Sequence, residues 1–215
     1  MTIFDRIILL TTGVTALYLI WRMWMRYQES KARHWIYTII GFAVLFVAGV
    51  LLILFTYSAL ASPFVVIVSV LIPAGISAGI MAKTYPRFET PYLIFIIVGL
   101  LAIAVTRFTG PASLATIVLI IVHTTAGLTI FFLPISNVSR KIERSGYLWV
   151  TVGGALIGLG GIALAFLKTG RQLLFFSADF VFAILAPLLL LMTLAFTAGF
   201  MYVIQAARQK NVGEA

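Results

Sequence analysis

Seven long apolar stretches, joined by short polar connections, occupy almost the whole of this 215-residue chain. A transmembrane α-helix needs about 20 apolar residues to cross roughly 30 Å of hydrocarbon. Mean hydropathy is +1.14 and only 10% of the residues are charged. These features predict an all-α integral membrane protein, a seven-helix bundle that forms a single domain over residues 1–215. The expected helices cover residues 3–26, 35–57, 63–83, 90–108, 111–135, 147–168 and 178–207.

Basic residues are distributed unequally over the two sides of the predicted bundle. Eleven of the 15 fall on one side: Arg22, Arg26, Lys31, Arg33, Lys83, Arg87, Arg140, Lys141, Arg144, Arg208 and Lys210. Lysine and arginine accumulate on the cytoplasmic side of membrane proteins. We therefore expect the N-terminus outside and the C-terminus inside, in the cell (cytoplasmic) membrane. Such a collar of charge favours anionic lipids as partners and argues against nucleic acid.

An odd number of helices in this orientation permits two parallel three-helix units joined by a connecting helix. When the chain is shifted along itself by 113 residues, Thr38 falls on Thr151 and Gly41 on Gly154. Sequences of such apolar composition often match to this extent by chance. They leave a 3+1+3 repeat as a hypothesis.

His123 is the most notable single residue, because it lies about halfway along the fifth predicted helix, followed by Thr124 and Thr125. An ionisable side chain at that depth needs a polar partner inside the bundle. One interpretation gives His123 a function, as a proton relay, a ligand of haem or another pigment, or a polar contact for a solute. The other is structural: a neutral imidazole that hydrogen-bonds a neighbouring helix. The sequence requires no cofactor.

Metal and coupled-ion sites are not expected. The chain has no cysteine and only two histidines, His34 and His123, which lie at different depths. All five lysines lie at segment ends, which excludes a retinal Schiff base in the seventh helix. None of the six acidic residues is near the midplane, where ion-coupled transporters usually place a carboxylate. Asp179 either meets the dipole at the start of the seventh helix or lines an outer vestibule with Arg171.

Small residues mark two surfaces where helices are expected to approach closely. The third helix carries Gly75 and Gly79, and the sixth carries Gly154, Gly158 and Gly161. Small residues four positions apart lie on one helix face and let two backbones come together. The partner helix can belong to this chain or to another subunit, so a homo-oligomer or a larger assembly is open.

Three prolines, Pro73, Pro134 and Pro187, fall inside predicted helices. Each removes one helical hydrogen bond. The freed carbonyls can line a polar cavity or gate, or nearby serine and threonine hydroxyls can satisfy them.

No clustered carboxylates, nucleophile–base pair or metal site is evident, so an enzyme is not expected. Two functions remain. The first is a facilitator or channel for a small uncharged or weakly polar solute, with a polar interior built from His123, Thr124, Thr125, Pro73, Pro187 and Asp179. The second is a non-catalytic subunit of a larger bioenergetic, pigment-carrying or redox membrane complex.

Overall fold

The computed structural model describes residues 1–168 and 177–213. In this part of the chain the regular structure is entirely helical, and seven spans are long and apolar enough to cross a membrane. The protein is therefore a multi-pass membrane protein. Its α-helices are α1 (Ile3–Ser30), α2 (Arg33–Phe55), α3 (Pro63–Ser69), α4 (Leu71–Thr84), α5 (Glu89–Thr109), α6 (Ala112–Ser139), α7 (Leu148–Lys168) and α8 (Ala178–Gly213). Three 3-10 helices accompany them: η1 (Thr56–Ala61), η2 (Pro86–Phe88) and η3 (Ser145–Tyr147).

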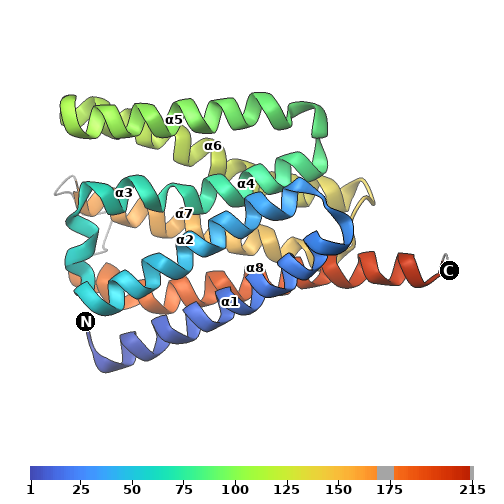
Figure 1. Cartoon of the computed structure of the whole chain (residues 1–215). Coiled ribbons are helices and arrows are strands. Elements are labelled where there is room, and N and C mark those ends of the chain that lie inside the picture. The colour runs from blue at the N-terminus through green and yellow to red at the C-terminus, as the bar shows by residue number, and fades with distance from the viewer. Residues whose placement is uncertain (169–176, 214–215) are drawn as a thin grey trace.

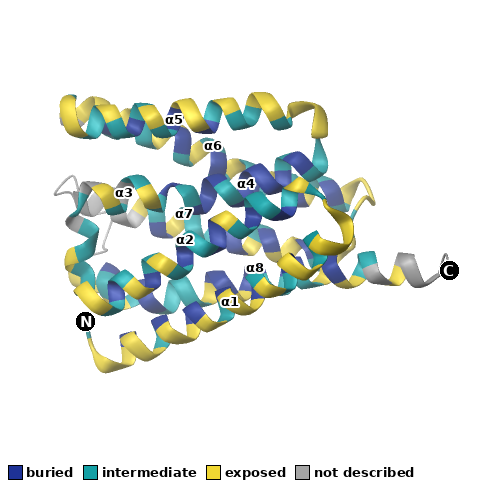
Figure 2. Cartoon of the chain, viewed as in Figure 1, coloured by how far each residue is buried: buried dark blue, intermediate teal, exposed yellow. Residues whose placement is uncertain are grey.

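Six of the long helices form a closed ring. Around the ring, α1 contacts α2, α2 contacts α4, α4 contacts α6, α6 contacts α7, α7 contacts α8, and α8 returns to α1. The fourth span, α5, lies outside this ring against α6 and α4, at the upper edge of Figure 1. Only 17% of its most apolar window is buried, against 56% for the Ile67–Thr84 span. Figure 2 shows the same contrast between buried ring helices and an exposed α5. The interior of the bundle is therefore surrounded by the six ring helices, and α5 is peripheral to it.

The third predicted helix, 63–83, is not continuous, because it divides into α3 and α4 at Val70. Pro73 has no N–H to donate to the carbonyl of Ser69 four residues earlier, which explains a break at this place. The next amide, that of Ala74, donates to the Val70 carbonyl at 3.1 Å. The Ser77 hydroxyl does not satisfy the carbonyl that Pro73 leaves, since it donates to the Ala74 carbonyl at 3.0 Å.

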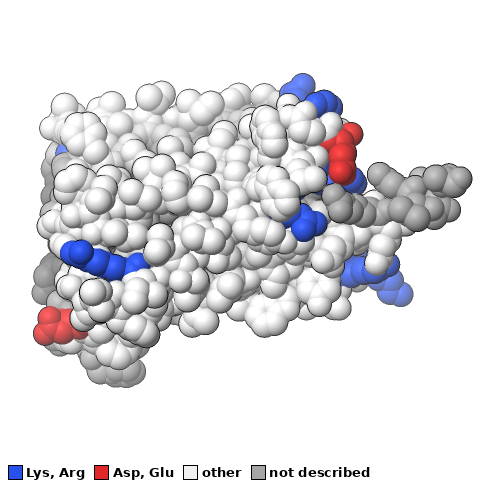
Figure 3. Space-filling model, turned by 60° about the horizontal axis from the view of Figure 1, so that its bottom comes forward, with Lys and Arg blue, Asp and Glu red and all other residues white. Residues whose placement is uncertain are grey.

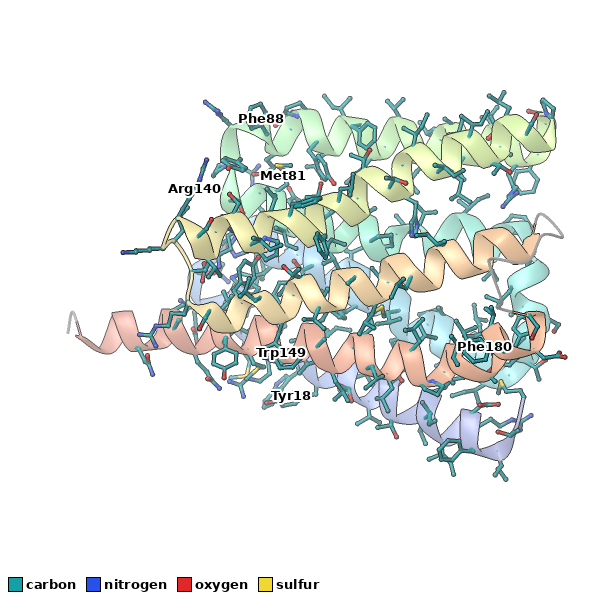
Figure 4. All side chains as sticks on the ribbon, turned by 180° about the vertical axis from the view of Figure 1, so that it is seen from behind. Tyr18, Met81, Phe88, Arg140, Trp149 and Phe180 are labelled. Carbon is teal, nitrogen blue, oxygen red and sulfur yellow. The ribbon has the colours of Figure 1, made fainter. Side chains whose placement is uncertain are left out.

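Three helices continue beyond the residues expected for them, all at the same end of the bundle. α1 ends at Ser30 rather than at residue 26, α6 at Ser139 rather than at 135, and α8 at Gly213 rather than at 207. Hydropathy marks the part of a helix that matches lipid, whereas backbone hydrogen bonds continue until the chain must turn. Arg140 and Phe88 lie at this end, and Phe180 lies at the opposite one (Figure 4).

Charged side chains gather at the two ends of the bundle. On the face shown in Figure 3, the surface between the ends carries no lysine, arginine, aspartate or glutamate. We call the end that holds Lys31, Arg33, Lys83, Arg87 and Arg140 the basic end. The two termini lie at opposite ends of the bundle, with the C-terminus at the basic end (Figure 1).

The glycines of α4 lie against α2. A Cβ atom on Gly75 would come within 2.7 Å of the Gly41 amide nitrogen and the Tyr37 carbonyl oxygen, and one on Gly79 within 2.8 Å of the His34 carbonyl oxygen. Real Cβ atoms do not approach other atoms this closely, so these positions fix how near the two helices lie.

The glycines of α7 also face partners inside the chain. A Cβ atom on Gly154 would lie 2.8 Å from Cγ2 of Ile130 in α6. Gly158 meets no partner among the described residues, because no heavy atom outside its own helix backbone lies within 4 Å of the place its Cβ would occupy. The other predicted glycine, Gly161, belongs to the site described below.

Candidate functional site

A cavity of about 160 Å³ lies inside the helix ring, in the half of the bundle away from the basic end. Every ring helix contributes to its wall, together with η1 and α3, whereas α5 does not. Most of the wall is aliphatic, with residues such as Leu9 of α1, Leu52 of α2, Ile157 of α7 and Leu185 of α8. The cavity therefore presents a predominantly apolar interior to any molecule that enters it.

Few polar side chains reach this wall, and His123 of α6 is the largest of them. The others include Thr12 and Ser69. Thr12 already donates its hydroxyl hydrogen to the Ile8 carbonyl at 2.9 Å, and Ser69 also has an interaction partner. For His123, no hydrogen bond joins either imidazole nitrogen to the described part of the chain. Among these polar side chains, the imidazole of His123 is therefore the group best able to form a hydrogen bond with a molecule in the cavity.

The position of His123 depends on a glycine of the neighbouring helix. The imidazole Nε2 lies 2.6 Å from the place that a Cβ atom on Gly161 of α7 would take. Any side chain larger than hydrogen would have to displace the ring. Gly160, the adjacent residue, also lines the cavity.

The break between α3 and α4 opens on the same cavity, since Ser69 and Pro73 both line it. Pro187 of α8 is not part of the wall, although Leu185 and Leu188 on either side of it are. The Thr193 hydroxyl donates to the Leu189 carbonyl, so it does not satisfy the carbonyl that Pro187 leaves.

The third interior proline, Pro134, lies in α6 near a hydrogen bond between helices. The Thr151 hydroxyl of α7 donates to the Phe131 carbonyl at 3.0 Å. Phe131 precedes Pro134 by three residues, and a proline weakens the helical hydrogen bonds of the turn before it. The Thr151 hydroxyl therefore donates to a carbonyl in the turn that Pro134 disturbs.

Three aromatic rings lie between the cavity and the basic end, one turn beyond the lining residues Leu45 and Met192. Phe42 of α2 meets Phe196 and Phe200 of α8 edge-on, with ring centroids 5.8 Å and 6.0 Å apart. All three are buried. Gly153 of α7 leaves room for them, because a Cβ there would lie 2.6 Å from the Phe196 ring. We call Phe42, Phe196 and Phe200 the aromatic plug.

Beyond the plug, a second cavity of about 10 Å³ adjoins the basic end. His34, Thr38, Lys83 and Tyr147 are among the residues that line it. The His34 Nε2 atom and the Tyr147 hydroxyl are buried there without a hydrogen-bond partner. Lys83 pairs with Glu143, which ties α4 to the connection after α6. The volume is at the lower limit for one water molecule.

Besides Pro187, three of the predicted polar-interior residues are not part of the cavity wall. Thr124 is exposed on the outside of α6, and Thr125 donates to the Ile121 carbonyl. Successive helical residues are rotated by about 100°, so with His123 on the wall its two followers turn away from it. Asp179 is exposed in the first turn of α8, and its suggested partner Arg171 lies outside the described residues.

The cavity does not fit a haem or a comparable pigment. A cavity of about 150 Å³ holds one benzene ring, whereas a tetrapyrrole has four linked rings. His34 lies beyond the aromatic plug and cannot act as a second ligand to a group at His123. Within the described residues, no group of three or more histidine, cysteine, aspartate or glutamate side chains is placed to hold a metal ion.

The sequence singled out His123, Pro73 and Gly161, which the structure brings to one cavity, but the aromatic plug was not predicted. Phenylalanine is common in this chain, with 17 residues, and neither Phe42 nor Phe196 belongs to a motif. The spacing of Phe196 and Phe200, one helical turn apart, was the available signal. Comparison with known proteins adds no identification, since no family model, curated protein or solved structure matches the chain.

Proposed function

We propose that this protein is a membrane facilitator for a small uncharged or weakly polar solute, and that the cavity at His123 is its binding site. The observation that carries the proposal is the cavity of about 160 Å³ inside the ring, walled by six of the seven spans. A protein whose only role is to anchor other subunits has no need of such a space.

The axial arrangement supports a transport role. The cavity occupies one half of the bundle, and a packed core that includes the aromatic plug occupies the interior of the other half. A solute site that is closed toward one membrane face is what alternating access requires. The plug joins α2 to α8, so a change in the distance between these two helices would open it.

The broken third span supports a moving wall. Pro73 lines the cavity at the place where α3 and α4 separate. Helix breaks at proline are tolerated within membranes where they face protein or a cavity. We propose that α3 can shift against α4 at Val70 when a solute enters.

The excess of lysine and arginine supports an orientation with the basic end in the cytoplasm. The N-terminus then lies outside, and the cavity is on the outer half of the cell membrane. Arg33, Arg87, Arg140 and Lys141 would meet anionic lipid headgroups at the cytoplasmic face.

The ring contacts support a 3+1+3 repeat. Exchange of α1, α2 and α4 with α6, α7 and α8 carries each contact of the first unit onto one of the second. It also carries the α1–α8 contact onto the α4–α6 contact. The connecting span, α5, stands outside. This is the pattern of two parallel units related by an axis along the membrane normal.

A non-catalytic subunit of a larger assembly is the alternative function. Its support is the small amount of hydrophilic sequence outside the spans and the glycine-rich surface of the sixth span. Gly153, Gly154 and Gly161 instead meet Phe196, Ile130 and His123 of the same chain. Because these glycines pack against helices of the same chain, they give less support to docking of another subunit, and we rank the facilitator first.

A flux assay tests the proposal. Proteoliposomes would be mixed with acetamide, 1,3-propanediol or 1,4-butanediol, and the rate of volume recovery followed by light scattering. The wild type should exceed empty liposomes for at least one solute. Ala48→Leu, which fills the cavity wall, should lose this excess, and Val47→Leu, on the exposed side of α2, should keep it. Rates equal to those of empty liposomes for every solute would contradict a facilitator.

A further inference from the structure

The cavity itself restricts what can occupy it. Its volume of about 160 Å³ matches the size of space that accepts one benzene ring. A sugar, a nucleotide or a lipid headgroup is too large. The occupant therefore has the size of a single ring or of an equally small aliphatic group.

The wall restricts the chemistry of the occupant further. Half of the lining residues are leucine or isoleucine, including Leu9, Leu45 and Leu189. A charged or many-hydroxyl solute would lose its hydration and find too few partners in return. The body of the occupant is apolar.

His123 supplies the one specific contact. Its imidazole lines the cavity and has no hydrogen-bond partner in the described residues. A neutral imidazole has one N–H donor and one acceptor nitrogen. A ligand hydroxyl, which can donate or accept, would pair with one of these groups inside the cavity.

We infer that the cavity binds a small amphiphile of the phenol or short-chain alcohol class, with its apolar body among the leucines and its hydroxyl hydrogen-bonded to His123. This inference names the solute class of the proposed facilitator and rests on the same cavity. Equilibrium binding and flux are measured separately, so each claim can fail without the other.

Binding to the full chain in lipid nanodiscs tests the inference. 4-Fluorophenol and fluorobenzene serve as probes, because they differ by one hydroxyl and report through ¹⁹F NMR. Empty nanodiscs give the non-saturable partition of each probe into lipid. The wild type should show saturable binding of both probes, with 4-fluorophenol about fivefold tighter, as expected of one net hydrogen bond.

Variants assign the hydroxyl preference to its source. His123→Leu should bind both probes with equal affinity, while His123→Gln, which retains a donor and an acceptor, should keep part of the preference. Ala48→Leu should abolish saturable binding, and Val47→Leu should leave it unchanged. If His123→Leu does not fold, the Gln and cavity-filling variants still decide the matter.

Two results would overturn the inference. One is the absence of saturable binding to the wild type, as expected if an acyl chain of the surrounding lipid fills the cavity. The other is equal affinity for the two probes, as expected if a water molecule keeps His123 satisfied. Either of these results, found together with flux of some other solute, would refute the inference and leave the facilitator intact. Saturable binding with the hydroxyl preference, but without flux of any solute, would support the inference and refute the facilitator.

Discussion

The Nε2 atom of His123 lies 2.6 Å from the point that a Cβ atom on Gly161 would occupy, although the two residues belong to different helices. This contact holds the imidazole at the cavity wall. It also makes a residue with no side chain part of the candidate site.

Gly161→Ala should therefore displace the imidazole. We expect a loss of about 1–3 kcal/mol in the free energy of unfolding from overpacking, together with a loss of the hydroxyl preference described above. Gly158→Ala is the matched control on the same helix, since nothing lies within 4 Å of its Cβ position. It should be neutral or more stable by up to about 1 kcal/mol, because alanine favours helix. Thermal unfolding in detergent compares them, and equal behaviour of the two variants would refute the contact.

A second prediction concerns the aromatic plug. Phe196→Ala removes the ring that Phe42 meets edge-on, and should cost about 3 kcal/mol or more of stability through the space left behind. In folded protein, solute flux through proteoliposomes should rise, because the barrier on the basic side is opened. Phe132→Ala, on the exposed face of α6, serves as control. A fall in stability with unchanged flux would mean that the plug is only structural.

The contact between α2 and α4 gives a third prediction. Gly75→Ala places a methyl group 2.7 Å from backbone atoms of Gly41 and Tyr37, which cannot move aside as a side chain can. We expect destabilisation of about 1–3 kcal/mol. Gly127→Ala in α6, with open space at its Cβ position, should show none. Urea or detergent unfolding curves measure the difference. A stable Gly75→Ala protein would show that the two helices lie farther apart.

Two tyrosines near the basic end should respond differently to loss of the hydroxyl. Tyr37 donates to Glu89 at 2.6 Å, so Tyr37→Phe should lose about 1.5–3 kcal/mol, the usual range for a bond to a charged group. The Tyr147 hydroxyl is buried without a partner, so Tyr147→Phe should be neutral or stabilising. If Tyr147→Phe is destabilised as much as Tyr37→Phe, the small cavity beside it holds a water molecule that bonds this hydroxyl.

The fold class could be predicted because hydropathy is a local property, which the residues of each span determine without regard to distant contacts. All seven expected spans correspond to helices. The break at Val70 was harder to place, since Pro73 indicates that a helix is disturbed without indicating whether it bends or divides. The end of α1 at the basic end was missed because the helix continues beyond residue 26 through the polar residues Gln28, Glu29 and Ser30, which hydropathy does not mark as part of a span.

The candidate site was predictable in its centre and not in its surroundings. His123 is conspicuous as an ionisable residue in an apolar helix, but its contact with Gly161 of the neighbouring helix could not be predicted from the sequence. Thr124 and Thr125 were grouped with it as neighbours in sequence, whereas the helical rotation separates them in space. The cavity and the plug depend on contacts among α1, α2 and α8, and such long-range contacts leave no local pattern.

Small molecules should reach the cavity inside the helix ring and stop at the aromatic plug. The chain has no native cysteine, so single substitutions report on this directly. Thr12→Cys places a thiol in the large cavity and Thr38→Cys places one in the small cavity beyond the plug. Both threonines are buried and donate to the carbonyl one turn earlier. In proteoliposomes treated with the small neutral reagent methyl methanethiosulfonate, the Thr12→Cys protein should react at least about tenfold faster, and 4-fluorophenol should slow it. Equal rates for the two variants, unaffected by 4-fluorophenol, would contradict the account.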